Sequence, residues 1–221
     1  DPAAGHRGIT AFIVEPRSGP GFAADPIAMT GLSNCLRSCA VFLDDFAVPV
    51  ENRLGEEGEG FKIAMNGLDY GRLTVTARLI GLARACLDLA RDYAKERVVF
   101  GHPIATYQMV QHLIADMTVN IEAARLMLYR MAWTMDRGEP ATREASQAKY
   151  FASTTAKHAA QSAAEIFGGY ALADEYPIKK ITAYVNMLNM GEGSPNTQRI
   201  LIAEDSLGFK DANRHPVRRR T

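Results

Sequence analysis

The stretch TYQMVQHLIADMTVNIEAARLMLYRMAWTM, residues 106–135, decides the fold class of this chain. Its apolar residues recur every three or four positions, at Val110, Leu113, Met117, Ile121, Ala124, Leu128 and Met131. A helix with about 3.6 residues per turn places residues of this spacing on one face. The stretch therefore predicts a long helix that buries one side, and the turn sequence at 138–140 ends it.

Helical patterns flank this stretch on both sides. The predicted helices cover residues 69–97, 106–135, 142–167, 178–190 and 194–207. The third has a face of small residues that allows close packing, namely Ala145, Ala148, Ala152, Ala159 and Ala163. Ser194 is a suitable N-cap for the last helix, and Pro195 suits its first position. Long helices with short connections predict a four-helix bundle followed by one short helix.

The first fifty residues have a different pattern. Residues 9–15 and 39–43 are rich in β-branched or aromatic side chains and predict strands, with a turn at 19–21. Two or three strands do not complete a sheet, so we expect others from residues upstream or from a partner chain. The chain then has three predicted segments: the end of a central β domain at 1–52, the four-helix bundle at 53–209 and a frayed basic tail at 210–221.

Composition argues against several classes of protein. The 221 residues include 25 Lys plus Arg and 25 Asp plus Glu, so no net charge favours nucleic acid or an anionic membrane. No apolar run is long enough to span a bilayer. Cys35, Cys39 and Cys86 do not form a disulfide framework, and neither they nor the five histidines have metal-ligand spacing. We therefore expect reduced thiols, no metal and a cytoplasmic protein, or one of the mitochondrial matrix in a eukaryote whose upstream targeting signal is not visible.

Short motifs follow one another along most of the chain. In order, they are VPVENRLG (48–55), LDYGR (68–72), RVVFGHPI (97–104) with Gln108, IFGGY (166–170), EYP (175–177) and EGS (192–194) with Gln198 and Arg199. Each motif alone is weak, whereas the whole series in register is specific. In this order and spacing, the motifs resemble those of the acyl-CoA dehydrogenase family.

The resemblance implies a fold and a reaction. The family fold has an N-terminal helical domain, a central β domain and a C-terminal four-helix bundle, and this chain would hold the end of the β domain and the bundle. The reaction is the α,β-dehydrogenation of an acyl-CoA thioester with FAD as the hydride acceptor. Glu192 is then the base that removes the α proton, because this weakly acidic proton needs a positioned base. Gly191 and Gly193 allow the backbone beside it to approach the substrate.

Other interpretations of this region follow from the residues alone. Glu192 is also a carboxylate at the start of a helix, where its negative charge interacts favourably with the positive end of the helix dipole. Some branches of the family place the base on the earlier helix, immediately before the arginine of the LDxxR motif. That position is Gly71 here, and glycine cannot act as a base. Glu192 is therefore the one expected base.

The resemblance also implies binding residues. Those expected to bind the cofactor are Arg97, Phe100, Gln108, Glu165, Gly168, Gly169 and Ser194. Those expected to bind the substrate are Asp69, Arg72 and Gly193. Arg97, Phe100 and Gln108 would reach the FAD of a neighbouring subunit, where a guanidinium suits the pyrophosphate. The structural alternatives are a helix-end cation for Arg97, core packing for Phe100, a helix stop at the glycine pair and an ion pair between Asp69 and Arg72.

Three positions depart from the family pattern. Glu165 stands where glutamine is usual. Gly191 replaces the usual aromatic residue before the base, which predicts a larger acyl pocket and a branched, cyclic or otherwise bulky acyl group. Ser194 replaces threonine and keeps the hydroxyl group.

Two classes of function compete. The first is an enzyme: an acyl-CoA dehydrogenase that passes electrons to an electron-transferring flavoprotein, or an oxidase or CoA-ester reductase on the same scaffold. The second is a catalytically silent bundle kept for assembly, or one subunit of a heteromeric enzyme. The resemblance also implies a homotetramer built as a dimer of dimers. Glu192, Arg97 and the glycine pair favour the enzyme.

Overall fold

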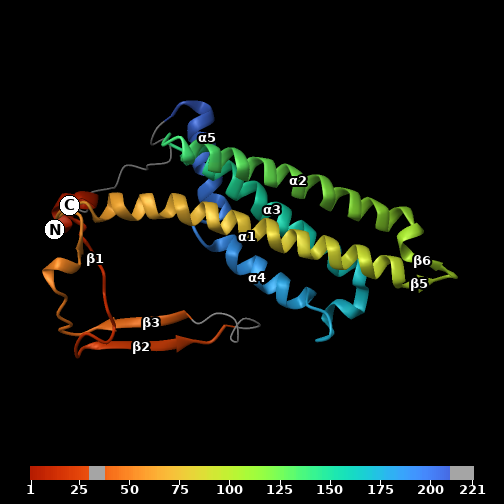
Figure 1. Ribbon diagram of the computed structural model, residues 1–221, viewed down its shortest axis with the longest axis horizontal. Helices are drawn as coiled ribbons and strands as arrows, with labels where there is room; N and C mark the ends of the chain where they lie inside the picture. Colours follow the sequence, from red (N-terminus) through yellow and green to blue (C-terminus); the bar gives the residue numbers. More distant parts are fainter. Residues whose placement is uncertain (30–37, 210–221) are drawn as a thin grey trace, which may run out of the picture. The chain divides into compact units, whose positions relative to one another are not determined.

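The computed structural model describes residues 1–29 and 38–209 of the chain (Figure 1). Cys35 and the basic tail predicted at 210–221 lie outside these residues. The chain forms two compact units, residues 1–70 and the residues from 71 onward. The division falls within one long helix, α1 (Gly60–Glu96). Among the described residues, no helix has the length and apolar character needed to cross a membrane.

Besides the start of α1, the first unit contains short elements that precede this helix. They are η1 (Pro2–Gly8), β1 (Ala11–Phe12), β2 (Phe22–Ile27), β3 (Ser38–Leu43), η2 (Val50–Asn52) and β4 (Arg53–Leu54). β1 pairs antiparallel with β4, and β2 pairs antiparallel with β3. The strand expected at 9–15 is therefore reduced to the two residues of β1. β2 was not predicted from the sequence, because it contains Pro26 and has no clear alternation.

The β2–β3 ribbon exposes apolar side chains. Val41, Phe42 and Leu43 are 57%, 53% and 55% exposed within the chain. A two-stranded ribbon is marginally stable on its own and needs further strands or a packed partner. The exposed side chains therefore support the expectation that this ribbon is part of a larger sheet, which stays a prediction.

The second unit is a helical bundle, as the apolar periodicity predicts. After α1 come α2 (Gln108–Asp136), α3 (Thr142–Phe167), α4 (Ile178–Met190) and the short α5 (Pro195–Leu207). The bounds of α3 and α4 equal the predicted ones, whereas α1 begins nine residues before the predicted start at residue 69. Short elements occupy two connections: β5 (Val98–Val99), β6 (His102–Pro103) and η3 (Ile104–Thr106) after α1, and η4 (Gly168–Leu172) after α3.

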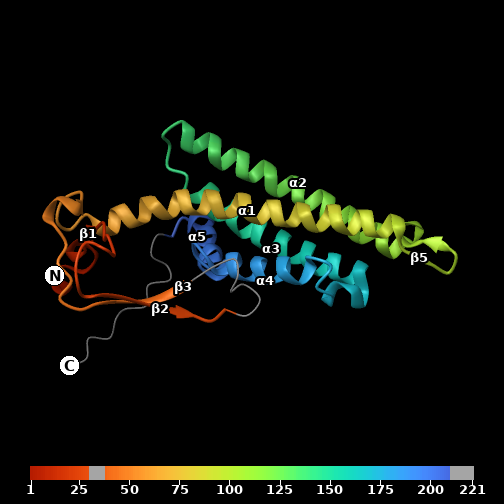
Figure 2. The same ribbon diagram turned by 60° about the horizontal axis from the view of Figure 1, so that its bottom comes forward.

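Helix α3 forms the centre of the bundle. It packs against α2, α4 and α5, and Figure 2 shows it running between α2 and α4. Its small residues are fully buried, among them Ala148, Ala152 and Ala156. Small side chains allow helices to approach closely, while larger ones from α1 and α2, such as Leu79 and Met117, fill the remaining space.

One side of α2 is apolar and open. Val119, Leu126, Tyr129 and Trp133 are each about 60% exposed or more. Their spacing of three, four and seven residues places them on one face of the helix. Several exposed apolar side chains on one face of a helix are typical of a protein–protein contact.

Candidate active site

The turn between α4 and α5 carries Glu192. Gly191 is extended (φ −64°, ψ 151°), whereas Glu192 and Gly193 have φ values of +56° and +92°. A positive φ is uncommon for a residue with a side chain and costs roughly 1–3 kcal/mol. Such strain persists where surrounding contacts hold the backbone in place, which happens most often at functional sites.

Buried polar groups hold this turn. Gln198 of α5 is fully buried, and its Nε2 donates to the carbonyl oxygens of Glu192 and Gly193, each at 3.2 Å. From α1, Arg72 is 8% exposed and its Nε donates to the same Glu192 oxygen at 3.4 Å. A Cβ at Gly193 would lie 2.6 Å from Gln198 Nε2, so this position requires glycine for space as well as for its backbone.

Gly71 of α1 makes room for the Glu192 carboxylate. A Cβ built at Gly71 would lie 2.5 Å from the carboxylate carbon and 2.8 Å from Oε1. No Cβ makes contacts this short, so any other residue at position 71 would force the carboxylate to move. In the family that the motifs resemble, different branches are expected to carry the base at position 71 or at position 192. These two positions lie next to each other in this structure.

Sequence reasoning missed Lys149 of α3. This lysine is fully buried, and its Nζ donates to Ser153 Oγ (3.0 Å), Asn189 O (3.1 Å) and Leu188 O (3.2 Å). Burial lowers its pKa to about 8, while the nearby Glu192 charge acts in the opposite direction and Arg72 adds to the lowering. A visible signal was present, because Lys149 lies on the alanine-rich face of α3 that the sequence marks as buried.

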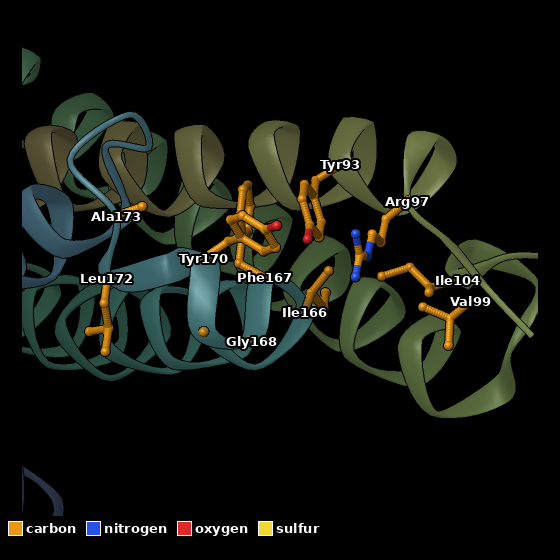
Figure 3. A pocket seen from close by; sticks show the side chains of 11 residues that line it. Tyr93, Arg97, Val99, Ile104, Ile166, Phe167, Gly168, Tyr170, Leu172 and Ala173 are labelled. Atoms are coloured by element: carbon orange, nitrogen blue, oxygen red, sulfur yellow. The ribbon is translucent and has the colours of Figure 1, made fainter.

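The residues expected to bind the cofactor gather mainly at the other end of the bundle. Arg97 follows the last turn of α1, and its guanidinium carbon lies 5.6 Å from the centre of the Tyr170 ring. Both residues line an open pocket of about 730 Å³, together with Tyr93, Phe167 and the glycine pair 168–169 (Figure 3). Gly168 has a φ of +58°, which ends α3 and turns the backbone along the pocket.

Phe100 projects from the β5–β6 hairpin. It has a φ of +53° and is followed by Gly101 at +81°, the pair of positive values that a tight two-residue hairpin turn needs. Its side chain is 91% exposed, so core packing within the chain, one of the two interpretations from sequence, is wrong. Phe100 and Glu165 line a second hollow of about 440 Å³ beside the first. Gln108 begins α2 close by along the chain and is exposed.

The remaining predicted residues have mixed surroundings. Glu165 is exposed and accepts a hydrogen bond from Gln161 Nε2 at 3.3 Å. The Ser194 hydroxyl caps α5 by accepting from Thr197 N at 3.4 Å. Asp69 belongs to the first unit and is half-buried.

The two groups of residues do not meet within one chain. Arg72 and Arg97 are 25 positions apart along α1 and the residue that follows it, and a rise of about 1.5 Å per residue separates them by roughly 37 Å. Figure 1 shows the same arrangement, with the β5–β6 hairpin at one end of the bundle and α5 at the other. Glu192, Gly193 and Ser194 thus share the α5 end with Arg72, apart from the residues around Arg97.

Comparisons with known proteins agree with the motifs. Residues 58–207 match the family described as acyl-CoA dehydrogenase, C-terminal domain. Over 215 residues the chain is 40% identical to the glutaryl-CoA dehydrogenase of Desulfococcus multivorans, which covers 97% of this chain and 55% of that protein. It is 41% identical over 204 residues to the caffeyl-CoA reductase-Etf complex subunit CarC of Acetobacterium woodii. This alignment covers 92% of this chain and 53% of that protein.

The fold agrees as well. The solved structure of a glutaryl-coenzyme A dehydrogenase in complex with glutaryl-CoA superposes with a TM-score of 0.91 and 39% identity, over all of this chain and 56% of that one. The chain therefore spans about half the length of the relatives that it matches. Because the family match covers the bundle from before α1 to the end of α5, the chain belongs to the acyl-CoA dehydrogenase family.

Proposed function

We propose that the protein catalyses the FAD-dependent dehydrogenation of an acyl-CoA thioester and that Glu192 is its base. The observation that carries this proposal is the position of Glu192. Its backbone is held at a positive φ by Gln198 and Arg72, and Gly71 clears space for its carboxylate. A carboxylate placed this carefully, on a strained turn, suits a group that must reach one proton of a bound substrate.

In this mechanism the residues of the chain position the base and take the proton. Glu192 removes the proton from the carbon next to the thioester carbonyl. Bound FAD supplies the acceptor for the hydride that leaves the β carbon, so that a carbon–carbon double bond forms. Gln198 and Arg72 hold the backbone carbonyl of Glu192, which limits the directions in which the carboxylate can point.

The residues around Arg97 fit a nucleotide cofactor. The rim of this pocket offers one guanidinium, a glycine turn along which a phosphate chain can approach the backbone, and aromatic faces. Glu165 brings a negative charge beside this region and is its one unfavourable feature. Since Arg97 lies roughly 37 Å from Arg72, we propose that this end of the bundle contacts the FAD of a neighbouring copy.

A homotetramer, built as a dimer of dimers, fits this arrangement. It would cover the apolar face of α2 that contains Val119, Leu126, Tyr129 and Trp133, and it would bring the Arg97 end of one copy to the Glu192 end of another. As electron acceptor we propose an electron-transferring flavoprotein, since the Acetobacterium woodii relative is named as part of an Etf complex.

A bulky acyl group is the proposed substrate. Among the described residues, a Cβ at Gly191 would find only the Leu188 carbonyl oxygen within 4 Å, at 3.7 Å, so these residues leave space beside the base. The name of the caffeyl-CoA reductase relative also points to an acyl group with an aromatic ring. Because Gly191 is extended, Gly191→Tyr should fit without backbone strain and lower kcat/KM for aryl or cyclic acyl-CoA by about tenfold or more. A small straight-chain acyl-CoA as the best substrate of the unaltered protein would refute this specificity.

The test of the main proposal is the visible spectrum of the FAD-loaded protein, made from the full coding sequence. Anaerobic addition of an acyl-CoA panel should bleach the flavin band, and Glu192→Gln should abolish the bleaching while the flavin stays bound. Flavin that no acyl-CoA reduces would favour the silent bundle. A Glu192→Gln variant as fast as the unaltered protein would instead refute the role of Glu192 as the base. Oxygen consumption distinguishes an oxidase from a dehydrogenase.

A further inference from the structure

We propose that Lys149 is a positioning residue for Glu192, because its buried ammonium group fastens the end of α4 from which the catalytic turn departs. This inference rests on the proposed role of Glu192 as the base. It adds a residue of α3 that none of the motifs contains, and it explains why a charge is buried in the bundle.

The hydrogen bonds of Lys149 lead to the turn. The last carbonyl groups of a helix lack partners within the helix, and those of Leu188 and Asn189 belong to the last turn of α4. Both accept from Lys149 Nζ, at 3.2 and 3.1 Å. Gly191 and Glu192 follow these two residues directly, so the ammonium fixes the backbone from which the carboxylate projects.

All three hydrogens of the ammonium group are used. Ser153, one turn along α3, accepts the third at 3.0 Å. A lysine has three donors and no acceptor, so these bonds satisfy it fully and fix its direction. A positive charge at the end of α4 also interacts favourably with the negative end of the helix dipole.

The charge itself is costly, and this argues for a purpose beyond packing. A fully buried lysine is rare because desolvation penalises its charged form. Each neighbouring element contributes one kind of group: Ser153 from α3, backbone carbonyls from α4, Arg72 from α1, and Glu192 from the turn between α4 and α5. Among the described residues, Glu192 is the one negative charge that favours the charged form of Lys149.

The positioning depends on protonation. A neutral amine has two hydrogens in place of three, so one of its three acceptors loses its bond when the proton leaves. Since burial lowers the pKa of Lys149 to about 8, that loss falls within the range where the enzyme can be assayed. The hydrogen bonding of Lys149 to the end of α4 is therefore expected to weaken, and kcat to fall, as the pH rises through 8.

The first experiment compares Lys149→Met with Lys157→Met, in holoenzyme made from the full coding sequence. Lys157 is an exposed lysine on the same helix, and the substitution is identical. At pH 7, Lys149→Met should raise amide hydrogen exchange at residues 190–194 about tenfold or more, because the end of α4 is no longer held. Its kcat should fall about 10- to 100-fold with little change in KM, whereas Lys157→Met should behave as the unaltered protein.

A second variant covers the case in which Lys149→Met fails to fold. Ser153→Ala removes one acceptor and leaves the charge in place. Losing a bond to the charged form favours the neutral amine, so the alkaline fall in kcat should move to lower pH, by about half a unit to one unit. A lysine that only fills space would produce no such shift.

The outcomes separate this inference from the proposed function. Equal hydrogen exchange at 190–194 in the two lysine variants, or an alkaline limb that Ser153→Ala does not move, overturns the positioning role even if Glu192→Gln is inactive. Conversely, flavin that no acyl-CoA reduces in the unaltered protein overturns the proposed function. The exchange comparison would still decide whether Lys149 holds the turn.

Discussion

Replacing Gly71 by alanine should damage catalysis without damaging the fold. The added Cβ would lie 2.5 Å from the carbon of the Glu192 carboxylate, whereas carbon atoms in contact prefer about 3.5 Å or more. The carboxylate must therefore move by about 1 Å. It is the end of a flexible side chain, so the movement costs little stability, but a misplacement of about 1 Å can cost up to about 10²-fold in rate.

The expected signature has two parts. The kcat for flavin reduction should fall by about 10- to 100-fold, which corresponds to about 1.4–2.7 kcal/mol in the activation barrier. The free energy of unfolding should stay level or rise by up to about 1 kcal/mol, because alanine favours a helix more than glycine does. Stopped-flow flavin reduction and urea denaturation measure these two quantities.

Gly81→Ala is the matched control. Gly81 lies on the same helix, and a Cβ built there meets no atom of the described part of the chain within 4 Å. It should show the same gain in helix stability with an unchanged kcat. If Gly71→Ala is as fast as Gly81→Ala, the Glu192 carboxylate does not act from the place that it occupies in this structure, and the argument from Gly71 is wrong.

Three further predictions concern titration, thiol reactivity and capping. The pKa of Lys149 is about 8 in the folded protein and 10.5 in the unfolded chain, so the unfolded state binds more protons between these two pH values. The free energy of unfolding should therefore rise with pH in this range, by roughly 1–3 kcal/mol relative to Lys149→Met, as urea titrations would measure. Burial raises the pKa of Cys86 to about 12, so iodoacetamide at pH 8 should label exposed Cys39 and spare Cys86 until urea unfolds the chain, as peptide mass spectrometry would show. Ser194→Ala should cost about 1 kcal/mol in urea denaturation through the lost cap of α5, and an unchanged midpoint would contradict that role.

The apolar periodicity, together with the proline and glycine residues at helix ends, was sufficient to predict most of the helices of the bundle. The proline and glycine signals around α3 and α4 predicted their bounds, because chain breaks of this kind depend on local backbone geometry. The start of α1 was missed. Glycines at 60, 67 and 71 lower the intrinsic helix propensity of this region, and packing contacts absent from any local pattern override it.

The candidate site depended on resemblance more than on local pattern. The motifs supplied Glu192 and Arg97, and the structure then placed them at opposite ends of the bundle. Sequence could not show that Gly71 faces the carboxylate, or that Lys149 reaches two carbonyls 39 and 40 positions later. These relationships arise when α1, α3 and α4 pack together, so only three-dimensional coordinates reveal them.

The separation of roughly 37 Å between Arg72 and Arg97 has a genetic consequence. If one copy supplies Glu192 and another supplies Arg97 to each site, a chain with Glu192→Gln and a chain with Arg97→Ala carry lesions that can complement each other. Mixed assemblies of these two inactive chains would contain sites in which both contributions are intact. Co-expression should then recover a fraction of the activity that neither variant has alone, as happens only when an active site is shared between polypeptides.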